Sequence, residues 1–430
     1  MKVAILGFAR EGKSLLKFLK KQPQFKKGPI DILDKKRDKN YLKNLYKYDL
    51  VFRSPGMPYN LPQIQKAIKN GTEVASITKL FFDLCPAKII GITGTKGKGT
   101  TSTLLYKILK AAGYDVQLAG NIGKPSIDIL SKLDRKSLAI LELSSFQLQD
   151  LDKSPTIAVV LDIFPDHMDV HKNMAEYTSA KSNICRHQKT NDKVFYFADN
   201  KLSKKIALKS RGKKIAITAP DDLSKNNIMA AAVAKNLGCP AEIIARTIKN
   251  FHGLEHRMEL ARTITLTKQH SHILPPSREA TDGRGENVRM LFYNDSASTN
   301  PQTAAKAILS LSNNNSATIL IAGGKDKGLD YTPLAHATKK AGNVKSIILF
   351  GENKNKIKRA LMGNKKLDIK TAKSLEGAVK LAFSATRSLI ANNQLLITIL
   401  FSPASASFDM FTDYADRGQR FKNIVKQIKT

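Results

Sequence analysis

The sequence predicts an α/β protein in which parallel sheets are covered by helices on both faces. Short apolar runs bounded by turn residues alternate with segments whose apolar residues recur at helical spacing. This alternation continues along most of the 430 residues, which are too many for a single hydrophobic core. We therefore predict three domains, formed by residues 1–87, 88–257 and 258–430. Sheets of this kind bind ligands at the carboxyl ends of their strands.

The first segment combines an apolar run with a turn that contains Gly7 and Gly12, and a second run ends in Asp34. Two glycines followed by a helix, with an acid about 20 residues later, is the arrangement that holds a dinucleotide in Rossmann domains. Tight strand–helix turns also carry glycines for packing alone. We predict a Rossmann-like domain here. Its expected elements are strands at Lys2–Leu6, Ile30–Leu33 and Asp49–Phe52, a helix through Leu15–Leu19, and a turn at Arg53–Gly56.

The second segment contains a glycine-rich turn, Gly91 to Thr101, between an apolar run and a helical pattern. Glycines let backbone N–H groups close around phosphate oxygens, and the helix dipole presents its positive end to the anion. Lys98 is placed to reach the terminal phosphates of ATP, and a following hydroxyl to meet Mg²⁺. A P-loop ATPase-type parallel sheet is therefore expected. Its predicted elements are strands at Ala87–Ile92, Leu138–Leu141 and Ile157–Leu161 and helices at Leu104–Ala112, Ala175–Cys185 and Ile228–Leu237.

Acidic and basic residues follow the strands of this second segment. Glu142 ends a strand beside the phosphate loop, which favours a Mg²⁺ ligand over a surface acid. The stretch from Asp166 to His171 is compatible with a transition-metal site or with a helix cap. His167 is more typical of a ligand contact than of a Zn²⁺ ligand, because no cysteine or third histidine is near. Lys181 lies in a predicted helix, where a solvated lysine is the alternative.

The third segment alternates again and predicts a second Rossmann-like domain. Pro301 stands where the first helical residue is expected, with Asn300 as its cap. The stretch from Lys268 to Arg289 is polar and lacks periodicity, so we expect a surface loop or local disorder there. The predicted elements are strands at Met290–Tyr293, Ala317–Ala322, Val344–Phe350 and Leu395–Phe401 and a helix at Ala304–Leu311.

Composition narrows the cellular setting. The net charge of +35 invites a nucleic-acid hypothesis, but the basic residues are spread evenly over the three segments without a tail or a stripe. No apolar run approaches the ~20 residues of a membrane span, and the stretch from Met1 begins a strand without a signal-peptide layout. Cys85, Cys185 and Cys239 lack metal-ligand spacing. We expect a cytoplasmic monomer without nucleic-acid or membrane partners.

Taken together and in order, these motifs resemble the Mur ligases, which join amino acids to peptidoglycan precursors. The resemblance covers nearly the whole chain, and its C-terminal motifs are similar to those of members that add D-glutamate to UDP-N-acetylmuramoyl-L-alanine. The motifs are Gly7, Gly12, Ser54–Gly56, Gly94–Lys98, Gly120–Gly123, Glu142–Leu148, Asp166–Asp169, Lys181, Gly253–Arg257, Asn294–Asn300, Gly323–Lys327, Ser402–Phe411 and Arg417–Gly418.

The resemblance implies ATP and two Mg²⁺ ions as cofactors and assigns a role to each matched residue. Catalysis would rest on Lys98, Glu142, His167 and Lys181. ATP would contact Gly94, Thr95, Lys96, Gly97, Lys98, Gly99, Thr100, Asn227, Arg257 and Asp295. Metal ligands would be Thr100, Glu142, His167 and Lys181, the last as a carbamate. The UDP-substrate would contact Gly7, Arg10, Gly12, Asp34, Ser54 and Asn121. D-Glutamate would contact Thr299, Lys327, Ser407, Phe408 and Tyr414.

The chemistry explains why such groups are needed. A free carboxylate is a poor acyl donor, so ATP converts it to an acyl phosphate, which the incoming amine attacks to form a tetrahedral intermediate. Each stage gathers negative charge, which Mg²⁺ and lysines stabilise in a cleft without water. The two carboxylates of D-glutamate call for a cation and hydroxyls in its pocket.

Several positions depart from the family pattern. Gly99 stands where a Ser or Thr usually follows the loop lysine, so Thr100 or Thr101 must supply the hydroxyl. Ala297 stands where many relatives carry a lysine. Further departures are Asp162 for a common Asn, Asn226 for a common His, and a short stretch between Asp34 and Ser54.

Three alternatives remain open at this point. The chain is expected to ligate D-glutamate, but another family member with a different amino acid or acceptor has most of the same motifs. Gly99 and Ala297 leave room for a degenerate relative that binds without catalysing. A basic protein that hydrolyses ATP on a nucleic acid predicts turnover stimulated by DNA or RNA.

Overall fold

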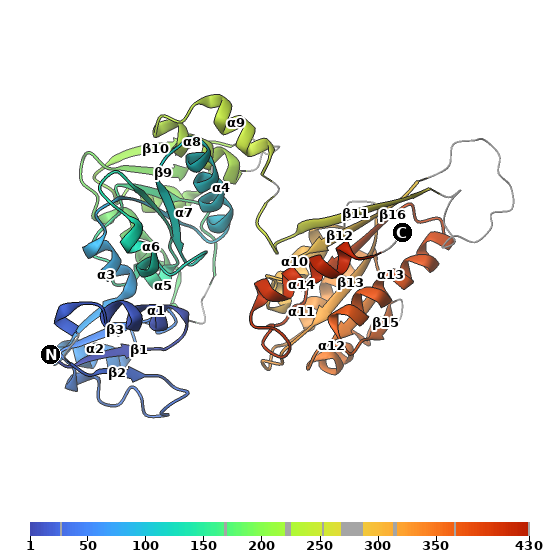
Figure 1. Ribbon diagram of the computed structural model, residues 1–430, viewed down its shortest axis with the longest axis horizontal. Helices are drawn as coiled ribbons and strands as arrows, with labels where there is room; N and C mark the ends of the chain where they lie inside the picture. Colours follow the sequence, from blue (N-terminus) through green and yellow to red (C-terminus); the bar gives the residue numbers. More distant parts are fainter. Residues whose placement is uncertain are drawn as a thin grey trace. The chain divides into compact units, whose positions relative to one another are not determined.

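The structure is a computed structural model, and it describes residues 1–25, 28–166, 170–219, 225–251, 253–267, 287–312, 316–364 and 367–428. Two compact units divide the chain, Met1–Phe251 and His252–Thr430. The first unit contains two sheets and the second contains one, so each of the three predicted segments holds a sheet (Figure 1). The predicted α/β class is confirmed.

The first sheet has the order β2-β1-β3-β4, with all strands parallel. Leu6 pairs with both Leu33 and Arg53, so the turns after β1, β2 and β3 lie along one edge. Its elements are β1 (Val3–Leu6), α1 (Arg10–Leu19), η1 (Pro23–Phe25), β2 (Ile30–Leu33), η2 (Leu45–Lys47), β3 (Leu50–Arg53), α2 (Pro62–Lys69), β4 (Glu73–Ser76) and α3 (Ile77–Leu84). The three predicted strands are present, and β4 is an additional edge strand.

The second sheet is also parallel, in the order β10-β9-β8-β5-β7-β6. The strands are β5 (Lys88–Thr93), β6 (Val116–Gly120), β7 (Leu138–Glu142), β8 (Ile157–Val160), β9 (Lys193–Phe197) and β10 (Lys213–Ile217). The helices are α4 (Lys98–Ala111), η3 (Ser126–Lys132), α5 (Ser145–Leu148), α6 (Met174–Arg186), α7 (Lys201–Ala207), α8 (Lys225–Asn236) and α9 (Ala241–Lys249).

Helices cover both faces of this second sheet. In β5, Ile89 packs toward α3, α6 and α7, whereas Ile90 and Ile92 pack toward α4, α8 and α9. Figure 1 shows α4 and α8 lying together on their face. Because alternate residues enter two cores, the strand contains consecutive buried apolar residues, and this short apolar run made it predictable.

The third sheet has the order β11-β12-β16-β13-β14-β15. The strands are β11 (Glu259–Thr267), β12 (Asn287–Asn294), β13 (Ala317–Gly323), β14 (Val344–Phe350), β15 (Asp368–Thr371) and β16 (Leu396–Phe401). The helices are α10 (Pro301–Ser310), α11 (Thr332–Ala341), α12 (Lys354–Leu361), α13 (Leu375–Ala391) and α14 (Tyr414–Lys426). One face packs against α13 and α14, and the other against α10, α11 and α12.

The expectation of purely parallel sheets is wrong at one edge. β11 pairs antiparallel with β12, which follows it in sequence, and such a pair needs no crossover helix. The predicted loop is also wrong over residues 287–289, because they belong to β12 and Val288 is fully buried. The rest of that predicted loop lies outside the described residues. The predicted helix start is confirmed, because Asn300 Oδ1 accepts from Thr303 N with Pro301 in the first turn.

Within the described part of the chain, the structure contains no helix with the length and apolar character required to cross a membrane.

Candidate active site

The glycine-rich loop joins β5 to α4, as the sequence predicts. Gly97 occupies the N-cap position of α4 with a φ of +82°, a conformation that side chains disfavour. A Cβ on this residue would also overlap Asn226 Oδ1 from α8. Among the described residues no side chain caps α4, and a helix start of this kind can donate first-turn N–H groups to a phosphate.

Lys98 folds back over this loop. Its ammonium donates to the carbonyl oxygens of Gly94 at 2.9 Å and Thr95 at 3.2 Å. Thr95 in turn fastens the loop to the segment after β8, since its N–H donates to Asp162 O at 2.8 Å and its hydroxyl accepts from Phe164 N at 2.9 Å. The predicted phosphate lysine therefore lies at the loop, half-buried at the start of α4.

The two hydroxyls considered as replacements at Gly99 occupy different environments. Thr101 is fully buried, and its hydroxyl donates to Asn226 Oδ1 at 3.3 Å. Thr100 is half-buried in the first turn of α4. Thr101 is thus engaged with α8, which leaves Thr100 as the candidate to meet a metal.

Two of the residues that depart from the family pattern, Asp162 and Asn226, contact side chains of neighbouring elements. Asp162 lies 3.6 Å from the ammonium of Lys225 at the start of α8, and Asn226 accepts the Thr101 hydroxyl. The predicted nucleotide residue Asn227 follows in the same helical turn and is half-buried. The substituted residues therefore hold α8 against the loop.

Glu142 lies at the end of β7 and is 5 % exposed. Its Oε1 accepts from Asn121 Nδ2 at 3.0 Å, and its carbonyl oxygen accepts from Asn121 N at 3.0 Å. The structure therefore brings a predicted metal ligand and a predicted UDP-substrate residue together. A buried carboxylate is the kind of oxygen ligand that Mg²⁺ prefers.

Lys181 lies in α6 and is only 2 % exposed, so the solvated alternative is wrong. Its amine donates to Gly94 O at 3.0 Å and to the Thr93 hydroxyl at 3.4 Å, and lies 4.8 Å from the centre of the Tyr177 ring. Burial, and then the charge of Lys98, hold the pKa of Lys181 well below its usual range, although Asp166 and Glu142 oppose the shift. Burial therefore makes the uncharged amine more accessible than it is in an exposed lysine.

Of the two histidines in the predicted motif, His167 and His171, only His171 lies among the described residues. His167 and Asp169 lie outside the described residues. His171 is buried, with Nε2 3.0 Å from the Ser145 hydroxyl and its ring stacked on Phe146. Among the residues that the structure describes, no three His, Cys, Asp or Glu side chains cluster as a metal site. A metal at Glu142 would need a further ligand, which a carbamate on Lys181 would provide.

The predicted UDP-substrate residues gather where the first sheet meets the second. Asp34 accepts from Phe8 N at 2.7 Å, and the Ser54 hydroxyl donates to Gly7 O at 2.6 Å. Hydrogen bonds from Lys36 N and Phe8 N lower the pKa of Asp34. Arg10 reaches across to Gly123 O at 3.1 Å, close to Asn121.

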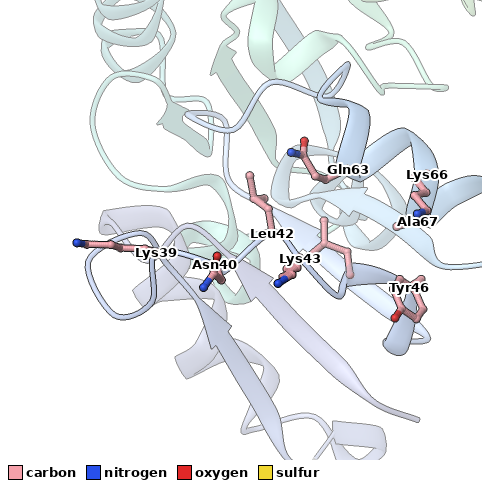
Figure 2. Close-up of a pocket in the computed structure, with 9 residues that line it drawn as sticks. Lys39, Asn40, Leu42, Lys43, Tyr46, Gln63, Lys66 and Ala67 are labelled. Atoms are coloured by element: carbon pink, nitrogen blue, oxygen red, sulfur yellow. The ribbon is translucent and has the colours of Figure 1, made fainter.

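A separate hollow of about 440 Å³ lies between the segment after β2 and α2, and Figure 2 shows the side chains around it. Its three lysines are exposed. None of the predicted UDP-substrate residues lines it. The lining residues are Lys39, Asn40, Leu42, Lys43, Leu45, Tyr46, Gln63, Lys66 and Ala67.

The remaining predicted residues lie in the second unit. Asp295 is buried at the end of β12, where its Oδ2 accepts from the Ser298 and Ser402 hydroxyls, and burial raises the pKa of its carboxyl. Arg257 is exposed just before β11. Asp295 Oδ1 accepts from Met258 N at 3.3 Å, and Met258 follows Arg257 directly in sequence.

The residues assigned to D-glutamate come from three loops. Lys327 lies over the ring of Phe408, with 5.6 Å from its Nζ to the ring centre, and Phe408 is 63 % exposed. Ser407 is buried, whereas Thr299 is half-buried and Tyr414 is exposed at the start of α14.

Arg417 is a residue that the site prediction omitted, although its motif was noted. It is fully buried and donates from Nε to the Ser296 hydroxyl and from Nη1 to Ser405 O, both at 3.0 Å. Burial lowers the pKa of Arg417 to about 10, against the opposing charge of Asp409. Its contacts join the loop after β12 to the loop after β16, which no local sequence pattern indicates.

Comparison with known proteins gives consistent matches. The profile of the Mur ligase middle domain matches residues 92–252. A UDP-N-acetylmuramoylalanine–D-glutamate ligase of Acetivibrio thermocellus is 35 % identical, with 90 % of this chain and 85 % of the relative covered. The enzyme of the same name from Clostridium botulinum strain Langeland is 32 % identical over 99 % of this chain and 97 % of its own.

Solved structures show the same fold at lower identity. The UDP-N-acetylmuramate-alanine ligase MurC from Thermotoga maritima has a TM-score of 0.55 at 15 % identity, with both chains fully covered. MurF from Acinetobacter baumannii has a TM-score of 0.56 at 15 % identity, covering 88 % of this chain and 85 % of its own. Escherichia coli FolC in complex with ADP has a TM-score of 0.53 at 15 % identity, covering 82 % of this chain and 93 % of its own.

Proposed function

The chain belongs to the Mur ligase family, and on this premise we propose that it joins D-glutamate to UDP-N-acetylmuramoyl-L-alanine at the expense of ATP, as a step of peptidoglycan precursor synthesis. The observation that carries the proposal is the convergence of Lys98 and the buried Lys181 on one atom, the carbonyl oxygen of Gly94 in the glycine-rich loop. The ammonium of Lys98 at a phosphate-binding loop suits a reaction that gathers anionic charge, and Lys181 lies beside it, where the proposed carbamate would form. The full-length similarity to D-glutamate ligases supports the choice of substrate.

Each of the three predicted segments has its own substrate in this proposal. We assign the UDP-substrate to residues 1–87, ATP to residues 88–257 and the incoming amino acid to residues 258–430. The loop amides and Lys98 hold the triphosphate, with Asn227, Arg257 and Asp295 at the nucleotide. Lys327 and the hydroxyls of Thr299, Ser407 and Tyr414 receive the two carboxylates of D-glutamate.

Magnesium fits the donors present. Glu142, Thr100, His167 and a carbamate on Lys181 would hold two ions, which neutralise charge on the phosphoryl group during transfer. The carbamate requires an uncharged amine, since its nitrogen lone pair adds to CO₂ and a proton is released. Burial lowers the pKa of Lys181, which shifts the amine toward the uncharged form, and this direction supports the proposal.

The reaction follows from these positions. The substrate carboxylate attacks the γ-phosphorus of ATP, giving an acyl phosphate and ADP. The neutral amine of D-glutamate then adds to the acyl carbon, and the tetrahedral intermediate gives up a proton from its nitrogen and expels phosphate to leave an amide. Lys98 lies where it can stabilise charge on the phosphoryl oxygens, and the buried surroundings of Glu142 and Lys181 limit hydrolysis by water.

We further propose that the enzyme acts as a cytoplasmic monomer. Cys185 and Cys239 are buried and Cys85 is half-buried, all three as free thiols, which suits a reducing compartment. The even spread of positive charge supports attraction of anionic substrates more than a nucleic-acid surface.

The test is phosphate release from ATP and Mg²⁺ with UDP-N-acetylmuramoyl-L-alanine and D-glutamate omitted singly and together. Release that requires both, with a product heavier by one glutamate residue, is expected. Release with another amino acid in place of D-glutamate would favour a different family ligase. Absence of release under every condition would favour a degenerate relative, for which Gly99 and Ala297 are the reason.

A further inference from the structure

Three buried polar side chains lie behind the residues proposed to receive D-glutamate. Tyr331 precedes α11, Asn353 precedes α12, and Ser405 lies in the loop after β16. None of them is more than 2 % exposed. Buried polar groups of this kind are costly unless they are hydrogen-bonded, so their arrangement is specific.

Asn353 is the centre of this cluster. Its Nδ2 donates to the Tyr331 hydroxyl and, at 2.7 Å, to the Ser405 hydroxyl. Its Oδ1 accepts from Gly324 N at 2.9 Å, and its own N–H donates to Gly324 O at 3.1 Å. The Tyr331 and Ser405 hydroxyls lie 3.0 Å apart and close the triangle. One amide side chain thus joins three loops.

The loop that Asn353 holds has little room to move. Gly324 has a φ of +154°, and a Cβ there would overlap Ala406 O. Lys325 N donates to the same Ala406 O at 2.9 Å, in an isolated antiparallel bridge. The two loops are therefore fixed to each other two to three residues before Lys327 and two residues before Phe408.

The two charged residues that precede Lys327 in its loop, Lys325 and Asp326, each form an ion pair. Lys325 pairs with Glu352 at 2.6 Å, and Asp326 pairs with Lys356 at 3.3 Å. Glu352 is the neighbour of Asn353 in sequence. Lys327, by contrast, places its ammonium over the Phe408 ring, where an incoming carboxylate can approach it.

We propose that Asn353, together with Tyr331 and Ser405, is a set of positioning residues that fixes Lys327 relative to Ser407 and Phe408 and thereby sets affinity and selectivity for the dicarboxylic amino acid. This inference rests on the proposed function. None of the three is a catalytic residue, because each acts through the loop it holds. Their removal should displace Lys327 without touching the ATP or UDP-substrate residues.

The test compares Tyr331→Phe and Asn353→Ala with the unaltered enzyme, measuring kcat and a separate KM for each substrate. Asn353→Ala is expected to raise the KM for D-glutamate about tenfold and Tyr331→Phe about threefold, while the KM values for ATP and UDP-N-acetylmuramoyl-L-alanine stay within about twofold. Discrimination against D-aspartate should fall in parallel. Tyr293→Phe, which removes a hydroxyl from β12 of the same unit, is the matched control and should change nothing.

Tyr331→Phe keeps the ring and its packing, so the inference stays testable if Asn353→Ala fails to fold. An unchanged KM for D-glutamate in either variant that folds would overturn it, as would equal changes in all three KM values. An unaltered enzyme that does not incorporate D-glutamate would instead overturn the proposed function, before any variant is compared.

Discussion

Arg53 and Asp150 form an ion pair of 2.7 Å whose two side chains are 0 % and 3 % exposed. Arg53 ends β3 of the first sheet, and Asp150 follows α5, which begins soon after Glu142 of the second sheet. The same guanidinium donates to Met57 O at 2.7 Å and to Phe146 O at 3.0 Å. The pair therefore holds the turn of the proposed UDP-substrate site against the segment that follows the proposed metal ligand.

Breaking this pair should be costly. Arg53→Met leaves the Asp150 carboxylate buried without its partner, so we expect the free energy of unfolding of the first unit to fall by about 3–5 kcal/mol. Denaturant unfolding measures the loss. Lys79→Met is the control, since it removes a pair with Asp152 that is partly exposed and should cost no more than about 1 kcal/mol. Equal small losses in both variants would contradict a structural role for the Arg53 pair.

Lys98→Ala should abolish ligation while leaving the fold intact. The ammonium lies at the carbonyl oxygens of the phosphate loop, so its loss removes charge stabilisation worth about 10²–10³-fold or more in kcat. Phosphate release and thermal unfolding are measured together. Lys110→Ala removes an exposed lysine from the same helix and should retain activity. Near-normal ligation by Lys98→Ala would refute the phosphate-loop assignment.

If Lys181 acts as a carbamate, the activity of the enzyme should depend on dissolved CO₂. In bicarbonate-free buffer at mildly acidic pH, where a carbamate is labile, the unaltered enzyme should lose most of its activity and regain it when bicarbonate is restored. Lys181→Ala should be severely impaired, and bicarbonate should not change its rate. Phosphate release under both conditions is the measurement. Full activity without CO₂ would mean that the buried amine acts in its unmodified form.

The sequence predicted β5 and β13 because each contains a run of buried apolar residues, but it missed β9, which lies between β10 and β8 in the second sheet. It also missed the edge strand β10, whose Lys213 and Lys214 are exposed and whose pattern lacks a continuous apolar run. The loops of the candidate site were predicted from the spacing of their glycine and lysine residues. The Arg53–Asp150 pair and the contacts of Asn353 could not be predicted, since each joins residues far apart in sequence whose meeting depends on strand order.

Glu11 offers a pH-dependent test at the UDP-substrate site. It lies in the first turn of α1 between Arg10 and Gly12, and Gln147 Nε2 donates to its carboxylate at 3.4 Å. Burial raises the pKa of Glu11 to about 7, although the charges of Arg10 and Arg53 oppose the shift. The folded protein thus favours the protonated acid, so this stabilisation is complete below the ordinary carboxyl pKa and is lost as the pH rises through about 7.

Because we assign the UDP-substrate to Gly7, Arg10 and Gly12, an ionised Glu11 between Arg10 and Gly12 should repel this anionic substrate. We expect the KM for this substrate to rise between about pH 6 and pH 8, and Glu11→Gln to remove the rise, because the amide stays neutral. Glu11→Gln should also be more stable than the unaltered protein above pH 7 and equal to it near pH 4.5. Glu73→Gln, an exposed change in β4 of the same sheet, should keep the original pH profile. If Glu11→Gln shows the same rise in KM, another group in the site must be titrating.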